Sequence, residues 1–221
     1  MIIDDKRGEV RIKPTAHIES TAVIIGPATI QGGAYVGHNA IVGAPPQYKG
    51  YWPQGGHGKR ANAGVYIGAG TVVRELCQVH QGVQRTTFVG DDCLLMAGCH
   101  IAHDSSIGAH CTLGSFSTLG GHTTLGGHVT FGQGVVTHPW VIVGAYSMVG
   151  LNSSVIEDVL PYQKVAGSPA RLLGKNTGAG GDKQEWNESC FDETQWVHYD
   201  ALRIRRNSLK KEMRNDGDPE R

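Results

Sequence analysis

Two histidines and an aspartate stand together in the pentapeptide HIAHD, at residues 100–104. Imidazole has a pKa near neutrality, so a histidine can take a proton from an attacking hydroxyl or amine at physiological pH. A carboxylate beside it can fix the tautomer and raise the basicity of the ring. The same residue types bind zinc when three ligands converge on one ion. His103 and Asp104 are therefore a candidate catalytic pair, with a metal site or plain surface side chains as alternatives.

A six-residue repeat organises most of the chain and determines which of these side chains can meet. From Ile12 onward every sixth residue is branched and aliphatic, and the fifth residue of five consecutive units is Ala. Those alanines are Ala16, Ala22, Ala28, Ala34 and Ala40. The register resumes at Ile67 and then runs from Val89 to Val155. A period of six fits neither a helix nor a long amphipathic strand, and it is typical of a parallel β-helix whose units are one short strand and a corner.

The repeat resembles that of the hexapeptide-repeat acyltransferases, and the resemblance implies a left-handed parallel β-helix with three hexads per coil. We therefore expect an all-β solenoid of about seven coils over residues 1–174, associated as a homotrimer. A loop at 44–64 breaks the register, and residues 84–87 form a smaller interruption. Residues 175–221 are predicted to be a linker and a short C-terminal helical tail, with the helix over 192–213.

Eighteen residues per coil would stack four histidine-bearing units on one face. Allowing for the interruption at 84–87, the stacked units begin at Val79, Ile101, Leu119 and Thr137. The histidines that they carry are His80, His103, His122 and His138, and His100 directly precedes the second unit. At sheet spacing the four imidazoles would lie within about 15 Å of one another along the axis.

Three interpretations of this column are open from the residues alone. One is coincidence, because the chain has eleven histidines. Another is a zinc site like that of the γ-class carbonic anhydrases, which share the fold. As the family signature reads, two of its ligands are five residues apart, whereas the spacings here are three and six. The third is general base catalysis by His103, with Asp104 as its orienting group. We favour the third, and we predict no metal ligand.

Three longer stretches resemble the UDP-N-acetylglucosamine acyltransferases of lipid A synthesis. They are LLMAGCHIAHDSSIG (94–108), STLGGHTTLGG (117–127) and VTHPWVIVGAYSMVGLNSSVIEDVLPY (136–162). The resemblance implies that His103 deprotonates a sugar hydroxyl as it attacks a thioester, that Asp104 orients His103, and that the backbone N–H of Gly121 stabilises the oxyanion. It also implies substrate contacts for five further residues, which are His80, His100, His122, His138 and Lys49.

Three departures from the family pattern bear on the substrate. The family's substrate loop usually reads like PPQDLKYKG, and here PPQYKG (45–50) is shorter, with Lys49 as the candidate lysine. Pro139 replaces the usual Gln after His138. Leu151 falls on the position, often Gly, that limits acyl length in the family. Since a close-packed groove has no spare room, we expect a shorter acyl chain than the long hydroxyacyl groups of the family.

Composition limits the remaining classes of function. Lys plus Arg and Asp plus Glu both number 20, so the basic stripe of a nucleic-acid-binding protein is not expected. The first residues lack the apolar core of a signal peptide, and no apolar run approaches the roughly 20 residues of a membrane span. The five cysteines contain no CxxC pair, which indicates free thiols. These features predict a soluble cytoplasmic protein without a membrane span.

The predicted function is transfer of an acyl group from a pantetheine thioester to a sugar or nucleotide-sugar acceptor. Acyl carrier protein or coenzyme A would carry the acyl group as a co-substrate, and no bound cofactor is expected. Two alternatives are kept. One is an acetyl-coenzyme A-dependent sugar N-acetyltransferase on the same scaffold. The other is a zinc carbonic anhydrase-like or purely structural solenoid.

Overall fold

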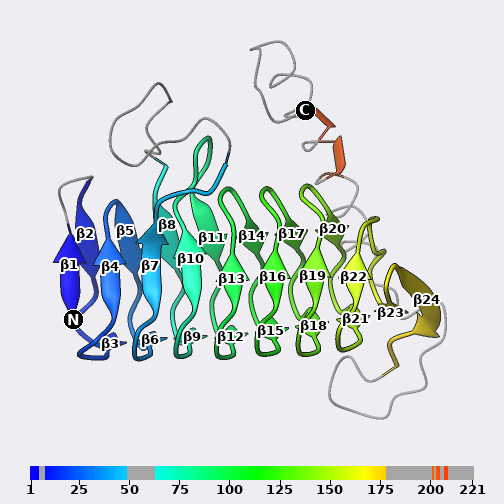
Figure 1. The fold of residues 1–221 in the computed structure, drawn as a ribbon, viewed down its shortest axis with the longest axis horizontal. Helices are drawn as coiled ribbons and strands as arrows, with labels where there is room; N and C mark the ends of the chain where they lie inside the picture. Colours follow the sequence, from blue (N-terminus) through cyan, green and yellow to red (C-terminus); the bar gives the residue numbers. More distant parts are fainter. Residues whose placement is uncertain (5–7, 49–62, 178–200, 202, 205–206, 209–221) are drawn as a thin grey trace.

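The chain folds into a parallel β-solenoid in which successive coils lay short strands side by side in three sheets (Figure 1). This computed structural model describes residues 1–4, 8–48, 63–177 and five isolated positions between 201 and 208. In Figure 1 the strands of the nearest sheet run upward and the chain returns behind them as it advances from the N-terminal end, which is a left-handed winding. The predicted fold class is confirmed.

The first sheet has eight parallel strands, stacked in the order of the coils. They are β1 (Ile2–Asp4), β4 (Val23–Ile25), β7 (Ile41–Ala44), β10 (Gln78–His80), β13 (His100–Ile101), β16 (Thr118–Leu119), β19 (Val136–Thr137) and β22 (Ser154–Val155). Eight strands mean about eight coils, slightly more than the predicted seven, because β1 precedes the first hexad recognised at Ile12.

The other two sheets follow the same stacking. The second sheet contains β2 (Val10–Ile12), β5 (Ala28–Ile30), β8 (Val65–Ile67), β11 (Thr87–Val89), β14 (Ser106–Ile107), β17 (Thr124–Leu125) and β20 (Ile142–Val143). The third contains β3 (His17–Ile18), β6 (Tyr35–Val36), β9 (Val72–Val73), β12 (Leu94–Leu95), β15 (Thr112–Leu113), β18 (Thr130–Phe131), β21 (Met148–Val149), β23 (Gln163–Gly167) and β24 (Ala170–Lys175). β23 and β24 pair antiparallel, and this hairpin ends the described solenoid.

The core is the stack of branched residues that begin the hexads. Val79, Ile101 and Leu119 are fully buried and lie in register on successive coils. Burial of one such side chain favours folding by about 1.5–3 kcal/mol relative to exposure. The fifth positions hold small residues, and the four cysteines there are buried free thiols, as predicted: Cys77, Cys93, Cys99 and Cys111.

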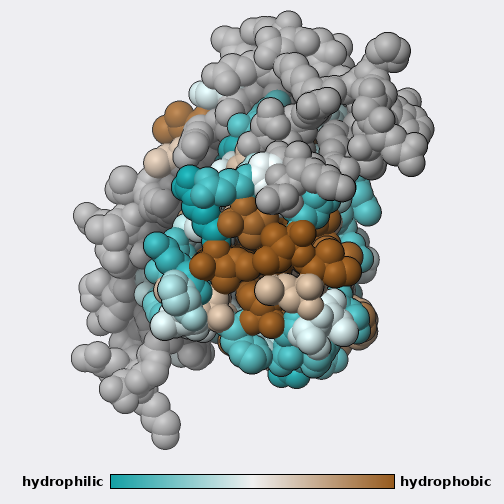
Figure 2. Space-filling model, turned by 90° about the vertical axis from the view of Figure 1, so that its left-hand side faces the viewer, coloured by the Kyte–Doolittle hydropathy of each residue, from teal (hydrophilic) through white to brown (hydrophobic). Residues whose placement is uncertain are grey.

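The ends and interruptions of the solenoid are described only in part. Figure 2 views the N-terminal end, where apolar side chains are gathered and Ile2 and Ile3 are exposed. The predicted loop at 44–64 coincides with the connection between β7 and β8, although 49–62 lie outside the described residues. Most of the predicted helix over 192–213 also lies outside them, so the tail remains a prediction. No helix among the described residues is long and apolar enough to cross a membrane.

Candidate active site

The predicted histidine column lies on neighbouring coils of the first sheet. The strands β10, β13, β16 and β19 are consecutive in that sheet (Figure 1). Val79 pairs with Ile101, the register expected from an eighteen-residue coil with four inserted residues. His80 ends β10, and His103 and His122 stand at the turns that follow β13 and β16. The repeat therefore brings these imidazoles to one side of the solenoid.

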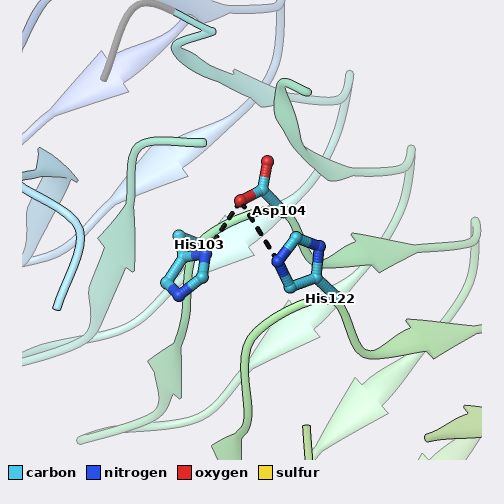
Figure 3. Close-up of side chains that lie close together, drawn as sticks. All are labelled: His103, Asp104 and His122. Atoms are coloured by element: carbon cyan, nitrogen blue, oxygen red, sulfur yellow. Dashed lines mark hydrogen bonds and ion pairs between the residues drawn. The ribbon is translucent and has the colours of Figure 1, made fainter. Parts of the chain in front are cut away.

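His103, Asp104 and His122 form one buried cluster (Figure 3). Nδ1 of His103 lies 2.8 Å from Oδ2 of Asp104, and Nε2 of His122 lies 3.7 Å from the same oxygen. The two imidazole rings are edge to face, at an interplanar angle of 89° and a centroid separation of 5.2 Å. Since an ionised carboxylate only accepts hydrogen bonds, Nδ1 of His103 carries the proton and Nε2 keeps its lone pair.

Asp104 is held in its charged form. Its side chain is fully buried, and burial alone would raise the pKa of the carboxyl. The hydrogen bond from His103, the nearby His122 and the backbone N–H groups of Arg85 and Gln84 outweigh burial, so the pKa of Asp104 lies below its ordinary value. A charged Asp104 is the form that can orient His103 as a base.

Gly121 lies directly against the edge of the His103 ring that carries Cε1 and Nε2. A Cβ added to Gly121 would lie 2.9 Å from both Cε1 and Nε2 of His103. The Gly121 carbonyl accepts a hydrogen bond from the backbone N–H of Trp140, at 2.9 Å, but the Gly121 N–H has no partner among the described residues. A backbone donor beside a general base is the arrangement that stabilises an oxyanion during acyl transfer.

Known proteins similar to this chain include hexapeptide-repeat transferases. The bacterial transferase hexapeptide family (six repeats) matches residues 86–121. An acyl-(acyl carrier protein) UDP-N-acetylglucosamine O-acyltransferase of Syntrophobacter fumaroxidans is 44% identical over 172 residues, which are 76% of this chain and 64% of that protein. The counterpart from Paracidovorax citrulli is 49% identical over 140 residues, 62% of this chain and 51% of that protein. A UDP-N-acetylglucosamine acyltransferase from Bacteroides fragilis has the same fold, with a TM-score of 0.69, 23% identity and coverage of 88% of this chain and 82% of that one.

The chain is a hexapeptide-repeat protein that resembles the UDP-N-acetylglucosamine O-acyltransferases. The similarity includes the histidine column, because the 172 aligned residues exceed any stretch of the chain that could avoid it. The chain spans 64% of the length of the first of these relatives and about half of the second.

His80 and His100 form a second imidazole pair beside the cluster. Their ring centroids are 4.5 Å apart. Nδ1 of His80 lies 2.6 Å from the Pro45 carbonyl oxygen and donates to it, which leaves Nε2 as a buried acceptor without a partner among the described residues. Burial lowers the pKa of His80 to about 4, an effect that exceeds the opposing hydrogen bond to Pro45, and burial also lowers the pKa of His100. Both rings are therefore neutral near pH 7.

Three predicted site residues lie apart from the buried cluster. His138 follows β19 on the next coil, is exposed, and has Nδ1 3.0 Å from the Pro139 carbonyl oxygen. Leu151 is 70% exposed at the turn after β21, in the third sheet. Lys49 lies outside the described residues.

Several residues that build this site were not predicted from the sequence. Trp140 stacks flat on His122, with a centroid separation of 3.8 Å and an interplanar angle of 4°. The eighteen-residue spacing of His122 and Trp140 was the signal that could have revealed this contact. The Tyr48 ring lies 5.6 Å from that of His103. Arg85 and Thr87 hydrogen-bond to Asp104, and no spacing rule predicted them because they lie in the interruption of the repeat.

The cluster also has donors suited to a metal ion. Within the described part of the chain, the group able to hold one is His103, Asp104 and His122, whose ligand atoms lie within 4.8 Å of one another. Imidazole nitrogens and a carboxylate are zinc ligands. The Asp104 carboxylate also accepts hydrogen bonds on both oxygens, from the Gln84 N–H at Oδ1 and from Nδ1 of His103 at Oδ2.

Proposed function

We propose that this chain transfers an acyl group from the thioester of acyl carrier protein to a hydroxyl of UDP-N-acetylglucosamine. The relatives described above carry this reaction in their names. The observation that carries the proposal is His103, with Nδ1 bound to the Asp104 carboxylate and Nε2 beside the backbone of Gly121. An oriented base next to a backbone donor that has no partner among the described residues suits attack of an alcohol on a thioester.

The proposed reaction has two proton movements. Nε2 of His103 takes the proton of the acceptor hydroxyl while the hydroxyl oxygen attacks the thioester carbonyl carbon. The negative charge that develops on the carbonyl oxygen is stabilised by the Gly121 N–H. The carbon–sulfur bond then breaks, and the thiolate receives the proton from His103. The products are the O-acyl sugar and the free pantetheine thiol, and Asp104 stabilises the imidazolium between the two steps.

The remaining site residues are proposed to bind the two substrates. The free Nε2 of His80 can accept a hydrogen bond from a sugar hydroxyl, and neutral His100 can share that role. His122, His138 and Lys49 are proposed to contact the acceptor or the donor, as the resemblance implies. We also propose that the protein acts in the cytoplasm. Coenzyme A is the alternative carrier of the acyl group.

Leu151 is proposed to limit the acyl group to a shorter chain than the family's long hydroxyacyl groups. Its exposed side chain stands at a turn on the edge of the solenoid, where a groove between subunits would end. An isobutyl group in place of hydrogen removes space that a close-packed groove cannot recover. Assays with acyl carrier proteins that bear acyl groups of increasing length test this limit. A maximum of kcat/KM at acyl chains of about twelve carbons or more would contradict it.

The His103→Ala variant tests the proposed reaction. Incubation with acyl carrier protein thioesters and UDP-N-acetylglucosamine, followed by mass spectrometry, should give the O-acyl product with the unchanged protein. Loss of the base should reduce kcat by about 10²–10⁴-fold. His110→Ala is a matched control, because this exposed histidine lies outside the column. Equal activity of the His103→Ala variant would remove the base mechanism, and product from acetyl-coenzyme A and an amino sugar alone would favour an N-acetyltransferase.

A further inference from the structure

The connection between β10 and β11 is longer than its counterpart on the next coil. From Val79 to Phe88 the chain uses four more residues than from Ile101 to Ser106, although these positions lie side by side in the sheets. The extra residues belong to the interruption that the repeat analysis located at 84–87. They form a tight turn, since a Cβ at Gly82 would lie 1.6 Å from the Arg85 carbonyl oxygen. A glycine at position 82 is therefore required by the turn.

This turn directs three consecutive backbone N–H groups at one carboxylate oxygen. Oδ1 of Asp104 accepts hydrogen bonds from the N–H groups of Val83, Gln84 and Arg85, at 3.1, 2.8 and 2.7 Å. Successive N–H groups arranged in this way form an anion-binding concavity. The Val83 N–H is shared with Oδ2, at 3.2 Å, and Oδ2 is the oxygen that faces His103 and His122.

The same connection also binds the main chain of Asp104. At the equivalent turns of the next coils, His122 and Trp140 donate their N–H groups to carbonyl oxygens of the coil before, at 3.0 and 2.9 Å. Asp104 instead donates its N–H to the Thr87 hydroxyl, at 2.9 Å, and its carbonyl accepts a hydrogen bond from Nε of Arg85, at 2.7 Å. At this turn the Thr87 hydroxyl thus takes the place of the backbone acceptor, and Arg85 adds a second bond.

We propose that residues 82–87 are an anion cradle that positions the catalytic pair, with Arg85 and Thr87 as its positioning residues. The cradle holds Asp104 as a carboxylate with Oδ2 toward Nδ1 of His103, and this contact sets the tautomer in which Nδ1 carries the proton and Nε2 does not. The inference deepens the proposed acyl transfer and rests on it for its kinetic part. The tautomer of His103 can be measured without any turnover.

Thr87→Val is the first test, because valine keeps the shape of this buried residue and removes the acceptor of the Asp104 N–H. We expect kcat to fall roughly tenfold with KM within about twofold, since a small displacement of a base costs rate more than binding. The His103 Nδ1–H signal in ¹⁵N-resolved NMR should weaken or shift. Thr87→Ser should restore both. The matched control is Thr71→Val, because Thr71 is another buried threonine and its hydroxyl accepts a hydrogen bond from the Cys93 N–H at 3.0 Å.

Arg85→Met is the second test and does not depend on a buried residue. It removes the bond to the Asp104 carbonyl while keeping the backbone N–H, and Arg85→Lys should recover part of the loss. Unchanged kcat and an unchanged His103 signal in both Thr87→Val and Arg85→Met would overturn the cradle. A protonated Nδ1 in the unchanged protein, lost in these variants, would support the cradle even where no acyl transfer is found. The two proposals therefore fail separately.

Discussion

At the scale of single residues, the reactivity of His103 depends on what its neighbour can accept. Oδ1 of Asp104 accepts hydrogen bonds from three backbone N–H groups, and Oδ2 accepts one from the imidazole and shares the Val83 N–H at 3.2 Å. The three donors need an acceptor at Oδ1 whatever residue occupies the position. An oxygen at the Oδ2 position makes Nδ1 of His103 a donor, and an NH₂ group there would make it an acceptor. This choice decides which ring nitrogen carries the proton and which one can act as the proposed base.

The Asp104→Asn variant follows directly from this arrangement. Its amide oxygen must take the Oδ1 position, so its NH₂ group faces Nδ1 of His103 and forces the proton onto Nε2. We expect kcat to fall by about 10³–10⁴-fold with little change in the thermal midpoint, because the wrong tautomer cannot accept a proton. Steady-state kinetics measures kcat, the ¹⁵N shifts of His103 report the tautomer, and thermal unfolding gives the midpoint. Asp91→Asn is the matched control at an exposed carboxylate, and retention of half the kcat in Asp104→Asn would contradict the assignment.

His80 should make the free energy of unfolding depend on pH. Burial lowers the pKa of this histidine to about 4 in the folded protein, against an ordinary value of 6.5. The unfolded chain therefore binds the proton first as pH falls, so the stabilisation is present above pH 6.5 and is lost as pH falls toward 4. The loss should be on the order of 3 kcal/mol. Urea unfolding at a series of pH values measures it.

The control for this prediction is His80→Gln, which keeps a polar side chain and removes the titrating group. Its free energy of unfolding should decline less than that of the unchanged protein between pH 6.5 and 4. Parallel curves for the two proteins would mean that His80 does not titrate with the expected shift. His17→Gln serves as a second comparison, since that histidine is on the surface near the N-terminal end.

At the scale of the elements, the hexad predicts the strands better than it predicts the interruptions. One branched residue in six is enough to fix which side chain points inward, and the register of Val79, Ile101 and Leu119 follows from counting. The cradle could not be predicted in this way, because its donors at residues 83–85 are backbone N–H groups. Every residue type except proline has such a group, so the residue types at these positions do not reveal the donors. Their direction depends on the turn, and the turn was recognisable only as a break in the period.

The core position beneath the catalytic pair gives an element-scale prediction. Ile101 is fully buried between Val79 and Leu119, two residues before His103. Ile101→Ala should lower the free energy of unfolding by about 2–5 kcal/mol, because a cavity remains where the solenoid cannot collapse. Denaturant unfolding measures the change. The matched control is Ile156→Ala, at an isoleucine that is 50% exposed on the same solenoid, and equal losses in the two variants would contradict the stacked core.

At the scale of the whole molecule, exposed apolar side chains gather along one edge of the solenoid. Leu76, Phe116 and Leu151 are exposed at the turns that follow β9, β15 and β21, which are strands of the third sheet. Each of these turns leads into the first sheet, which carries the histidine column. An apolar edge beside a catalytic face is the kind of surface that subunits of an oligomer bury. It supports the homotrimer that the resemblance implies.

If the chain forms the proposed homotrimer, assembly and activity should be linked. Light scattering should give three times the 23.6 kDa mass of the chain at micromolar concentration. Because the acyl groove is proposed to lie between subunits, activity per subunit should fall on dilution at the concentration where the measured mass falls, and the two curves should coincide. Replacing Phe116 by Asp should move both curves to higher concentration, whereas His110→Ala, at an exposed residue, should leave them in place. A monomer with full activity per subunit would contradict the shared groove and would leave the His103 cluster as the whole of the catalytic apparatus.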